Sequence, residues 1–333
     1  MLVDPYGRRL CYLRVSVTDR CNLRCVYCMP PQGVAKLSHE EILTLEEIAR
    51  IVRVAAELGV EKVRLTGGEP LVRRNLEVLL MALGEINLPG GVHLTTNGWL
   101  LGERLELLER AGVRAVNISL DSLDPARYGI ITGIGEQAGA QGLKRVMQAI
   151  EAAVEVGAFK VKINTVVLRD LNLEEVEEIA SLSLRWPVAV RFIEYMPVGR
   201  HTPYRPESFV PAEEVLGRLR SLGTLLPLPS GPSDGPARRY RVEGAPGEVG
   251  VISAVSSHFC MSCNRLRLTA DGRVVPCLFS RSAVDLRELL RRGATDDELA
   301  QALEQAARIK PASHPQAASQ MLSSSRQMST LGG

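Results

Sequence analysis

The sequence lacks any strong imbalance of charge. Its 40 basic residues nearly balance 38 acidic ones, which gives a net charge of +2 at pH 7. This balance predicts no broad surface for nucleic acid or membranes, so a polyanion would have to be bound by locally clustered basic residues. Of the 40 basic residues 34 are arginine, a side chain suited to bidentate phosphate recognition. Codon bias explains that total more simply, so only arginines placed by a motif indicate a binding site.

Long apolar runs are also missing. Residues 1–13 mix charged and apolar side chains and contain no continuous apolar segment of signal-peptide length. No other stretch approaches the roughly eighteen uninterrupted apolar residues of a membrane span. We therefore expect a cytoplasmic location and no membrane association. With 333 residues and 45% hydrophobic content, the chain can form one large α/β domain and a smaller appendage.

Seven cysteines without an export signal favour metal binding or redox chemistry over structural disulfides. Cys11 stands apart and is expected to be a small buried hydrophobe. The other six form two groups, which are Cys21, Cys25 and Cys28, and Cys260, Cys263 and Cys277.

Short β-rich runs alternate with amphipathic helices from residue 13 to about residue 193, with a period of roughly thirty residues. The predicted strands are 13–17, 62–65, 92–95, 115–120, 160–167 and 188–193. Polar or glycine-rich clusters follow the first three, at the carboxyl ends that form the active face of parallel α/β folds. Six βα units rather than eight indicate an incomplete TIM-like (β/α) barrel, although the period alone leaves an open doubly wound sheet as an alternative.

Helix signals support this alternation. Thr44 and Glu47 form a capping box at the start of a helix that ends at Gly59. Further helices are predicted at 103–111, 142–156, 173–184 with Asn172 as cap, 285–292 and 295–307.

A compositional shift to proline, glycine and serine between Gly223 and Gly250 predicts a loose linker. We therefore expect a partial barrel over residues 1–222 and a smaller α+β domain over residues 223–333. The polar tail from residue 311 would be disordered on composition alone.

The first cysteine group lies in a loop that follows the first strand, with three and then two residues between its members. Three thiolates on so short a loop can ligate three irons of a cubane cluster and leave the fourth iron without a protein ligand. A small ligand with an amine and a carboxylate can chelate that open iron. Zinc is the alternative, but it would need a fourth protein ligand, and His39 is the nearest histidine in sequence.

This spacing, with Tyr27 just before the last cysteine, resembles the signature of the radical S-adenosylmethionine (SAM) superfamily. Gly67-Gly68-Glu69-Pro70, after the second strand, resembles the loop whose backbone receives the SAM amino group. Glycine pairs are common in turns, so this loop is informative only together with the cysteines. The resemblance implies a 4Fe-4S cluster held by the first cysteine group.

The second cysteine group has two and then thirteen residues between its members and encloses a predicted hairpin that turns at Ala270-Asp271-Gly272. With Gly272 in the left-handed region, Cys277 would face Arg265 and lie near Cys263. Arg265 and Arg267 would share a strand face with Cys263. On spacing alone a zinc site completed by His258 remains open.

The stretch from Phe259 to Phe279 closely resembles the GTP 3′,8-cyclase family of molybdenum cofactor biosynthesis. Further matches cover 12–14, 21–30, 64–70, 95–98, 117–121, 132–133, 191–199 and 332–333. The resemblance implies a second 4Fe-4S cluster with an open iron on Cys260, Cys263 and Cys277, with the guanine of GTP against it. The stretch from Gly133 to Gly142 looks expanded, and Leu331 stands where isoleucine is expected.

Individual contacts follow from the same resemblance. Tyr27, Gly68, Ser119 and Met196 would contact SAM, whereas Arg14, Arg64, Thr95, Lys162, Arg265 and Arg267 would contact GTP. Lys160 is a fallback for Lys162, because both point to the same side of a strand. Each residue also has an ordinary structural explanation, but a common location facing a triphosphate favours binding. Arg265 and Arg267 would serve catalysis through position and charge neutralisation.

The reaction implied by the resemblance is a radical ring closure and makes the chain a lyase. An external electron cleaves SAM to methionine and a 5′-deoxyadenosyl radical, which abstracts a ribose hydrogen from GTP. The C3′ radical then attacks C8 to give (8S)-3′,8-cyclo-7,8-dihydroguanosine 5′-triphosphate.

The implied partners are an electron donor and the next enzyme, cyclic pyranopterin monophosphate synthase, while a homodimer is left open. Truncation of the Gly332-Gly333 tail is expected to be damaging, because in the family this tail threads toward the active site. Two rivals remain: another radical SAM enzyme with an auxiliary cluster, such as a peptide modifier, and a non-catalytic zinc or electron-transfer module.

Overall fold

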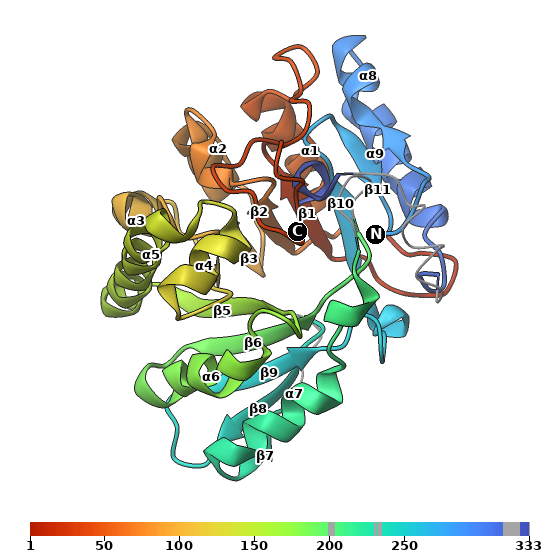
Figure 1. The fold of residues 1–333 in the computed structure, drawn as a ribbon. Coiled ribbons are helices and arrows are strands. Elements are labelled where there is room, and N and C mark those ends of the chain that lie inside the picture. The colour runs from red at the N-terminus through yellow and green to blue at the C-terminus, as the bar shows by residue number, and fades with distance from the viewer. Residues whose placement is uncertain (199–203, 230, 232–234, 316–326, 333) are drawn as a thin grey trace.

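The computed structural model describes residues 1–198, 204–229, 231, 235–315 and 327–332. Gly199 and Gly333, which carried sequence matches, lie outside these residues. The described chain forms a twelve-stranded sheet with the order β12-β11-β10-β1-β2-β3-β4-β5-β6-β9-β8-β7 (Figure 1). The strands are β1 (Tyr12–Ser16), β2 (Lys62–Thr66), β3 (Gly91–Thr96), β4 (Ala115–Ser119), β5 (Lys160–Val167), β6 (Ala189–Glu194), β7 (Leu225–Pro227), β8 (Arg238–Val242), β9 (Glu248–Ile252), β10 (Arg265–Leu268), β11 (Arg273–Val275) and β12 (Val284–Asp285).

Helices follow the strands in the expected alternation. The α-helices are α1 (Leu45–Glu57), α2 (Leu76–Gly84), α3 (Leu105–Arg110), α4 (Pro125–Thr132), α5 (Glu136–Val156), α6 (Val176–Arg185), α7 (Ala212–Leu219), α8 (Leu286–Arg291), α9 (Asp296–Arg308) and α11 (Met328–Leu331). Short 3-10 helices are η1 (Pro70–Val72), η2 (Gly102–Arg104), η3 (Leu173–Glu175), η4 (Pro206–Ser208), η5 (Arg220–Leu222) and η6 (Cys260–Ser262).

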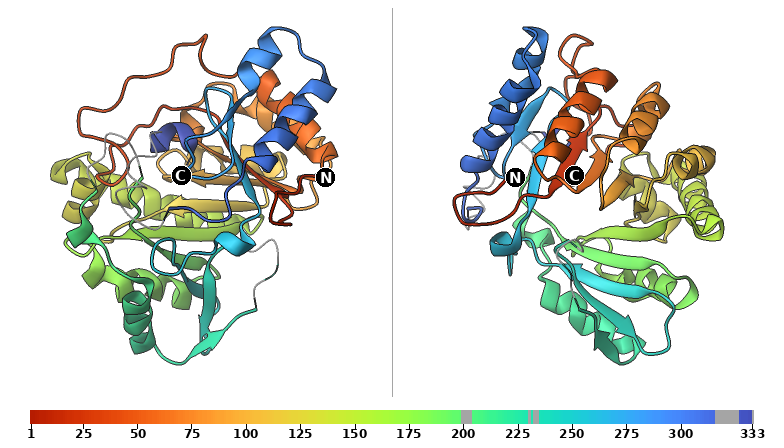
Figure 2. Two further views of the ribbon diagram at one scale, coloured as in Figure 1. Left: turned by 90° about the vertical axis from the view of Figure 1, so that its right-hand side faces the viewer. Right: turned by 180° about the vertical axis from the view of Figure 1, so that it is seen from behind.

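Eight neighbouring strands, from β10 through β1 to β6 and on to β9, pair in parallel. The row curves, and the helices of the βα units lie on its outer side (Figures 1 and 2). Helices α8 and α9 stand beside α1, where Arg50 and Arg53 of α1 form ion pairs with Asp296. The predicted α/β class, with six βα units in an incomplete barrel, is confirmed.

The strands alternate in a way that separates the core from the barrel interior. On β2, Val63 and Leu65 are fully buried against the apolar core, while Lys62 and Arg64 line an internal cavity. Successive side chains of a strand point to opposite faces, so the apolar set packs under the outer helices and the polar set faces inward. The barrel interior is therefore free to hold ligands, because the hydrophobic core lies between sheet and helices.

Two predicted elements differ from the structure. Helix α5 begins at Glu136 rather than at residue 142, since Gly139 and Gly142 allow close packing. A Cβ at Gly139 would come within 2.0 Å of the Pro125 carbonyl oxygen, and one at Gly142 within 2.8 Å of the Trp99 ring. Tertiary packing here overrides the low helix propensity of glycine. This close packing also gives a physical role to the stretch from Gly133 to Gly142.

Asn172 does not cap a helix with its side chain. Its amide instead donates to the carbonyls of Asp121 and Val166 and accepts from Leu168 N–H. The expected linker after Gly223 is also not loose throughout. Strand β8 pairs antiparallel with both β7 and β9, and β9 pairs parallel with β6, so the three strands extend the sheet beyond β6.

The segment between β9 and β10 joins the two outermost parallel strands of the eight-stranded row. It therefore spans the open side of the incomplete barrel, and it carries Cys260 and Cys263. None of the helices in the described part of the chain combines the length and hydrophobicity that crossing a bilayer requires.

Helix α2 offers a test of where the core lies. Leu79 is fully buried in the core, whereas its neighbour Val78 is 50% exposed. We expect Leu79→Ala to lower the free energy of unfolding by about 2–5 kcal/mol, because it leaves a cavity, and Val78→Ala to change it by less than about 0.5 kcal/mol. Urea denaturation of matched preparations measures both, and equal effects of the two substitutions would contradict this packing.

Candidate functional site

Both cysteine groups open into one cavity inside the barrel. Its lining includes every residue proposed from the sequence as a ligand or contact: Arg14, Cys21, Cys25, Tyr27, Cys28, Arg64, Gly68, Thr95, Ser119, Lys162, Met196, Cys260, Cys263, Arg265, Arg267 and Cys277. Residues far apart in the sequence thus share one internal space.

The first cysteine group lies on the loop between β1 and α1. The N–H groups of Cys28 and Met29 both donate to the Cys25 carbonyl, at 2.9 and 3.0 Å, so the chain turns tightly between the last two cysteines. Arg24 N–H and Val26 N–H donate to the carbonyls of Thr132 and Ile131 at the end of α4. Burial raises the pKa of the Cys28 thiol to about 12 and that of Cys25 well above its ordinary value. Metal binding would be needed to hold these thiols as thiolates.

The glycine-rich loop after β2 packs directly on the first cysteine loop. Gly67 has φ +140°, and a Cβ there would lie 2.3 Å from the Thr18 carbonyl oxygen. A Cβ at Gly68 would lie 2.3 Å from the Arg20 carbonyl oxygen. Only glycine fits such backbone contacts, so these two positions set the approach of the loop that leads into Cys21.

Glu69 ties this arrangement to the next strand. Its fully buried carboxylate accepts from Thr96 Oγ1, from Asn97 N–H and from Leu71 N–H, at 2.8, 2.6 and 3.0 Å. Burial raises the pKa of Glu69 to about 7, although these donors favour the ionised form. Asn97 in turn donates to Asn22 Oδ1 at 2.8 Å and reaches Cys21 Sγ at 3.8 Å. The ends of β1, β2 and β3 are thereby held together.

Tyr27 is held from the end of β4. Its hydroxyl donates to Asp121 Oδ2 at 2.7 Å, and the other carboxylate oxygen accepts from Val166 N–H at 2.8 Å. Burial raises the pKa of Asp121 to about 6. Asp121 was part of a sequence match but had no proposed role, and nothing local in the sequence indicates that it meets Tyr27.

The second cysteine group lies at the other end of the strands. Strands β1 and β10 are parallel, with Tyr12 opposite Arg265 and Arg14 opposite Arg267. The first cysteines follow the carboxyl end of β1, whereas Cys260 and Cys263 precede the amino end of β10. Five residues of strand, roughly 16 Å, separate the two ends. The cavity therefore runs along the strands between the two cysteine groups.

The hairpin that joins Cys263 to Cys277 has the predicted form. Gly272 has φ +81°, and β10 pairs antiparallel with β11 so that Arg267 lies opposite Val275. The same register, continued by two residues, places Cys277 opposite Arg265. Charges distinguish this group from the first: burial raises the pKa of the Cys263 thiol, but Arg265 and Lys310 lower it to about 6.

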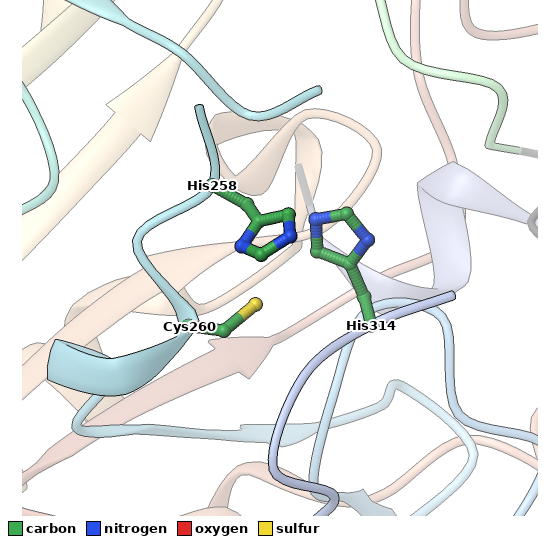
Figure 3. A group of neighbouring side chains, drawn as sticks. All are labelled: His258, Cys260 and His314. Atoms are coloured by element: carbon green, nitrogen blue, oxygen red, sulfur yellow. The ribbon is translucent and has the colours of Figure 1, made fainter. Parts of the chain in front are cut away.

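His258 lies near Cys260, as the zinc alternative required. Its other neighbour there is His314, which is not a cysteine of the second group (Figure 3). The ligand atoms of His258, Cys260 and His314 lie within 4.8 Å of one another, the one such set in the described part of the chain. His314 Nδ1 is 2.7 Å from the Pro315 carbonyl oxygen and Nε2 is 3.1 Å from that of Ala254. A neutral imidazole donates from only one of its nitrogens, so the set offers at most three ligands, whereas a structural zinc site has four.

Among the residues described, neither cysteine group gathers its three thiols closely enough to hold one metal ion. A tetrahedral zinc would bring thiolate sulfurs to within about 3.8 Å of one another, given Zn–S bonds of about 2.3 Å. A wider spacing fits thiolates that each bind a different iron of one cluster. The residues present therefore fit two cubane clusters better than two zinc ions.

Positive side chains dominate the cavity wall between the two cysteine groups. Residues Arg14, Lys62, Arg64, Lys162, Arg191, Arg265 and Arg267 all line it. Burial and then Arg191 lower the pKa of Lys162 to about 6. Burial and Arg265 likewise lower the pKa of Arg267 to about 10. Lys162, Arg191, Arg265 and Arg267 form no ion pair with any carboxylate among the described residues. This wall is built to receive an anion.

Arg64 is the most firmly held of these cations. Its Nε donates to the Tyr12 hydroxyl at 2.5 Å, Nη1 to Thr95 Oγ1 at 3.3 Å, and Nη2 lies 3.2 Å from His93 Nδ1. His93 Nε2 is 3.0 Å from the Gly90 carbonyl oxygen, so the ring can donate there and accept from Arg64. Burial and the charge of Arg64 lower the pKa of His93 to about 3, which keeps that ring neutral. Thr95 thus orients Arg64.

Three further residues line the cavity but were not predicted from the sequence: Tyr12, Lys62 and Arg191. All three lie inside or beside matched segments. The signal was available: Tyr12 and Lys62 each lie two residues before a predicted contact on the same strand. Arg191 Nε, Asn117 Oδ1 and Asn164 Oδ1 are buried and have no hydrogen-bond partner in the described chain. Unsatisfied buried polar atoms that face a cavity indicate a polar ligand.

The two candidate lysines of β5 differ sharply. Lys162 lines the cavity, opposite Asn117 of β4 and Ala189 of β6. Lys160, at the first residue of the strand, is exposed and is absent from the described lining.

The described end of the C-terminal tail, residues 327–332, contains a short helix whose Met328 lines the cavity. Arg267 Nη1 donates to the Gly332 carbonyl at 2.9 Å, and Gln327 Nε2 donates to the Cys28 carbonyl at 2.9 Å. Gly332 has φ +75°, and a Cβ there would lie 2.4 Å from Thr66 Cγ2. Helix α11 lies against β1, so the C-terminal end sits near the middle of the molecule (Figure 1). The tail thus touches both a cysteine loop and the cation wall.

Comparison with known proteins defines the class. Residues 15–183 match the Radical SAM superfamily, and residues 188–316 match the Molybdenum Cofactor Synthesis C family. With this fold and site, the protein is a radical SAM enzyme of molybdenum cofactor biosynthesis, with 4Fe-4S clusters and SAM as its cofactors.

The particular family follows from curated relatives. The chain is 47% identical to the GTP 3′,8-cyclase of Pelotomaculum thermopropionicum over 99% of each protein. It is 45% identical to that of Geobacter sulfurreducens, over 100% of this chain and 99% of the relative. The chain belongs to the GTP 3′,8-cyclase family, as its motifs predicted.

Solved structures support the fold. Streptococcus suis SuiB bound to S-adenosylmethionine aligns with a TM-score of 0.62 at 18% identity. The alignment covers 84% of this chain and 64% of SuiB, so this chain spans somewhat less than two thirds of SuiB. The likeness concerns the partial barrel.

Tyr12 provides a pH-dependent test of the cation wall. Burial raises its pKa, but Arg64, Arg14 and Lys62 outweigh burial and lower the pKa to about 7. Because this is below the ordinary value of 10.0, ionisation contributes fully to folded-state stability above about pH 10, and this contribution is lost as the pH falls through about 7. Tyrosinate absorbance should therefore show one step near pH 7 that Tyr12→Phe removes. Tyr6→Phe, at a 53% exposed position, should keep it; a step that survives in Tyr12→Phe contradicts the assignment.

Proposed function

We propose that the protein converts GTP to (8S)-3′,8-cyclo-7,8-dihydroguanosine 5′-triphosphate, the first step of molybdenum cofactor biosynthesis. The observation that carries this proposal is the wall of buried cations between the two cysteine groups. Grouped cations with lowered pKa values are costly to bury, and a triphosphate would neutralise several of them at once.

The two cysteine groups lie at opposite ends of this cavity, and we assign each group a different role. Cys21, Cys25 and Cys28 would hold the cluster that serves SAM, and Cys260, Cys263 and Cys277 the auxiliary cluster near the guanine. When bound, the clusters and SAM supply the electron transfer and radical chemistry of the reaction. The protein supplies position, charge and exclusion of water.

The residues near the first group suit SAM. Gly68 presents backbone that no larger residue would allow so close to the Arg20 carbonyl. Tyr27 is oriented by Asp121, and Ser119 and Met196 line the same cavity. We assign these four contacts to SAM.

GTP would lie along the strands toward the second group. Arg14, Arg64, Lys162, Arg265 and Arg267 would bind its phosphates and orient its ribose, and Thr95 would act by holding Arg64. Lys62 and Arg191 belong to the same wall and extend this assignment. Such residues act by position and charge neutralisation rather than by proton transfer.

The remaining parts of the proposal concern context. We propose an external electron donor and product transfer to cyclic pyranopterin monophosphate synthase, because the reaction needs electrons and its product needs a next enzyme. The cytoplasmic location and the division of the chain after residue 222 stay predictions from the sequence.

An anaerobic incubation with dithionite, SAM and GTP tests the activity. We expect 5′-deoxyadenosine formation that depends on GTP, together with a cyclised guanosine triphosphate identified by mass spectrometry. Formation of 5′-deoxyadenosine no greater than in a control without GTP would remove the cyclase assignment.

The two lysines of β5 give a matched pair for substrate binding. We expect Lys162→Ala to weaken GTP binding at least tenfold, about 1.4 kcal/mol, since it removes a buried cation from the wall. Lys160→Ala should change binding less than twofold, because that side chain is exposed. Equilibrium binding of GTP to both variants at equal iron content measures the difference, and comparable losses would place the phosphates elsewhere.

A further inference from the structure

Two buried cations outside the cavity lining hold the backbone next to all three cysteines of the second group. Lys310, which is 3% exposed, follows α9, and Arg8, which is 9% exposed, precedes β1. Neither residue carried a sequence match, and neither lines the cavity where we place GTP.

Lys310 clamps the open end of the β10–β11 hairpin. Its Nζ donates to the Arg265 carbonyl at 2.8 Å and to the Pro276 carbonyl at 2.6 Å. Arg265 lies two residues after Cys263, and Pro276 directly precedes Cys277. One ammonium group thereby ties together the two chain segments that carry these cysteines.

Arg8 holds the backbone of the remaining cysteine, Cys260. Its Nη1 donates to the Cys260 carbonyl at 2.6 Å, while further bonds reach the carbonyls of Pro311 and Ala312 at 2.5 and 2.8 Å. The Arg8 guanidinium is balanced by Asp4, at 2.5 Å. Arg8 thus also fixes the segment that follows Lys310.

Lys310, in contrast, forms no ion pair with a carboxylate within the described part of the chain. Burial lowers its pKa, and the charges that oppose this effect are those of Cys263 and Cys277. A buried ammonium without a carboxylate is costly, and neutral donors could make the same two hydrogen bonds to carbonyls. The positive charge of Lys310 therefore indicates that a negatively charged group binds at these cysteines.

We propose that Lys310 is a positioning residue for the auxiliary cluster, and that its charge raises the reduction potential of that cluster. The inference rests on the proposed function, which places a cluster on Cys260, Cys263 and Cys277. A fixed cation favours the more negative, reduced form of an anionic centre, so its removal lowers the potential.

The test uses the full chain with Cys21→Ser, Cys25→Ser and Cys28→Ser, so that only the auxiliary cluster can assemble. In this parent, we expect about four irons per chain after anaerobic reconstitution. Lys310→Gln keeps hydrogen-bond donors and removes the charge, and Lys310→Arg keeps the charge. Lys144→Gln, at an exposed position of α5, is the matched control.

Redox titration followed by electron paramagnetic resonance gives the midpoint potential of each variant. We expect Lys310→Gln to shift the ratio of oxidised to reduced cluster about tenfold toward the oxidised form at the parent's midpoint, about 59 mV for one electron. Lys310→Arg and Lys144→Gln should stay within twofold of the parent.

Each alternative outcome is decisive. A parent without iron refutes the proposed auxiliary cluster itself, whatever Lys310 does. An unchanged potential in Lys310→Gln at full iron content overturns the inference and leaves the proposed function standing. If Lys310→Gln loses iron, retention by Lys310→Arg supports the need for the charge, and loss by both variants overturns it.

Discussion

The parallel pairing of β1 with β10 is the constraint on which the rest of the site depends. It joins the strand before the first cysteine loop to the strand after the second, with Tyr12 opposite Arg265 and Arg14 opposite Arg267. Because both strands run the same way, the two cysteine groups come to lie at opposite ends of one cavity. The segment from β9 to β10 must then cross the open side of the barrel, which brings Cys260 and Cys263 to the cavity.

That pairing has an electrostatic cost. Arg14 and Arg267 are neighbours across the two strands, and like charges in this position repel. Burial and Arg267 lower the pKa of Arg14 well below its ordinary value. The same crowding recurs at Lys162 and Arg191, while the carboxylates of Asp121 and Glu194 on the lining bond to Tyr27, Ser256 and backbone N–H groups instead. The free protein stores this repulsion, and a polyanionic ligand relieves it. Binding and stability are therefore linked through the same side chains.

Much of this arrangement was predictable from local patterns. The period of strand and helix indicated six βα units, the capping box placed α1, and Gly272 shaped the hairpin. Local sequence patterns gave wrong predictions where contacts with a distant segment determine the conformation. Helix α5 begins earlier than predicted, although glycine normally weakens a helix. Its first turns pack so closely against α4 and Trp99 that only glycine fits there. The Asn172 side chain donates to the carbonyls of Asp121 and Val166 instead of capping a helix. The end of the polar tail forms hydrogen bonds with Arg267 and with the Cys28 carbonyl, and composition does not predict these contacts.

The sequence by itself determined the chemistry of the ligands: two cysteine groups with their spacings, the glycine-rich loop, and a set of arginines and lysines at alternate strand positions. Those features are local, since ligand type and strand alternation depend on neighbouring residues along the chain. Only the tertiary structure decided which ends of the strands the cysteines occupy, that Lys162 rather than Lys160 faces the cavity, and that Lys310 and Arg8 stand behind the second group. These outcomes depend on strand order and register, which arise from packing between segments up to about three hundred residues apart.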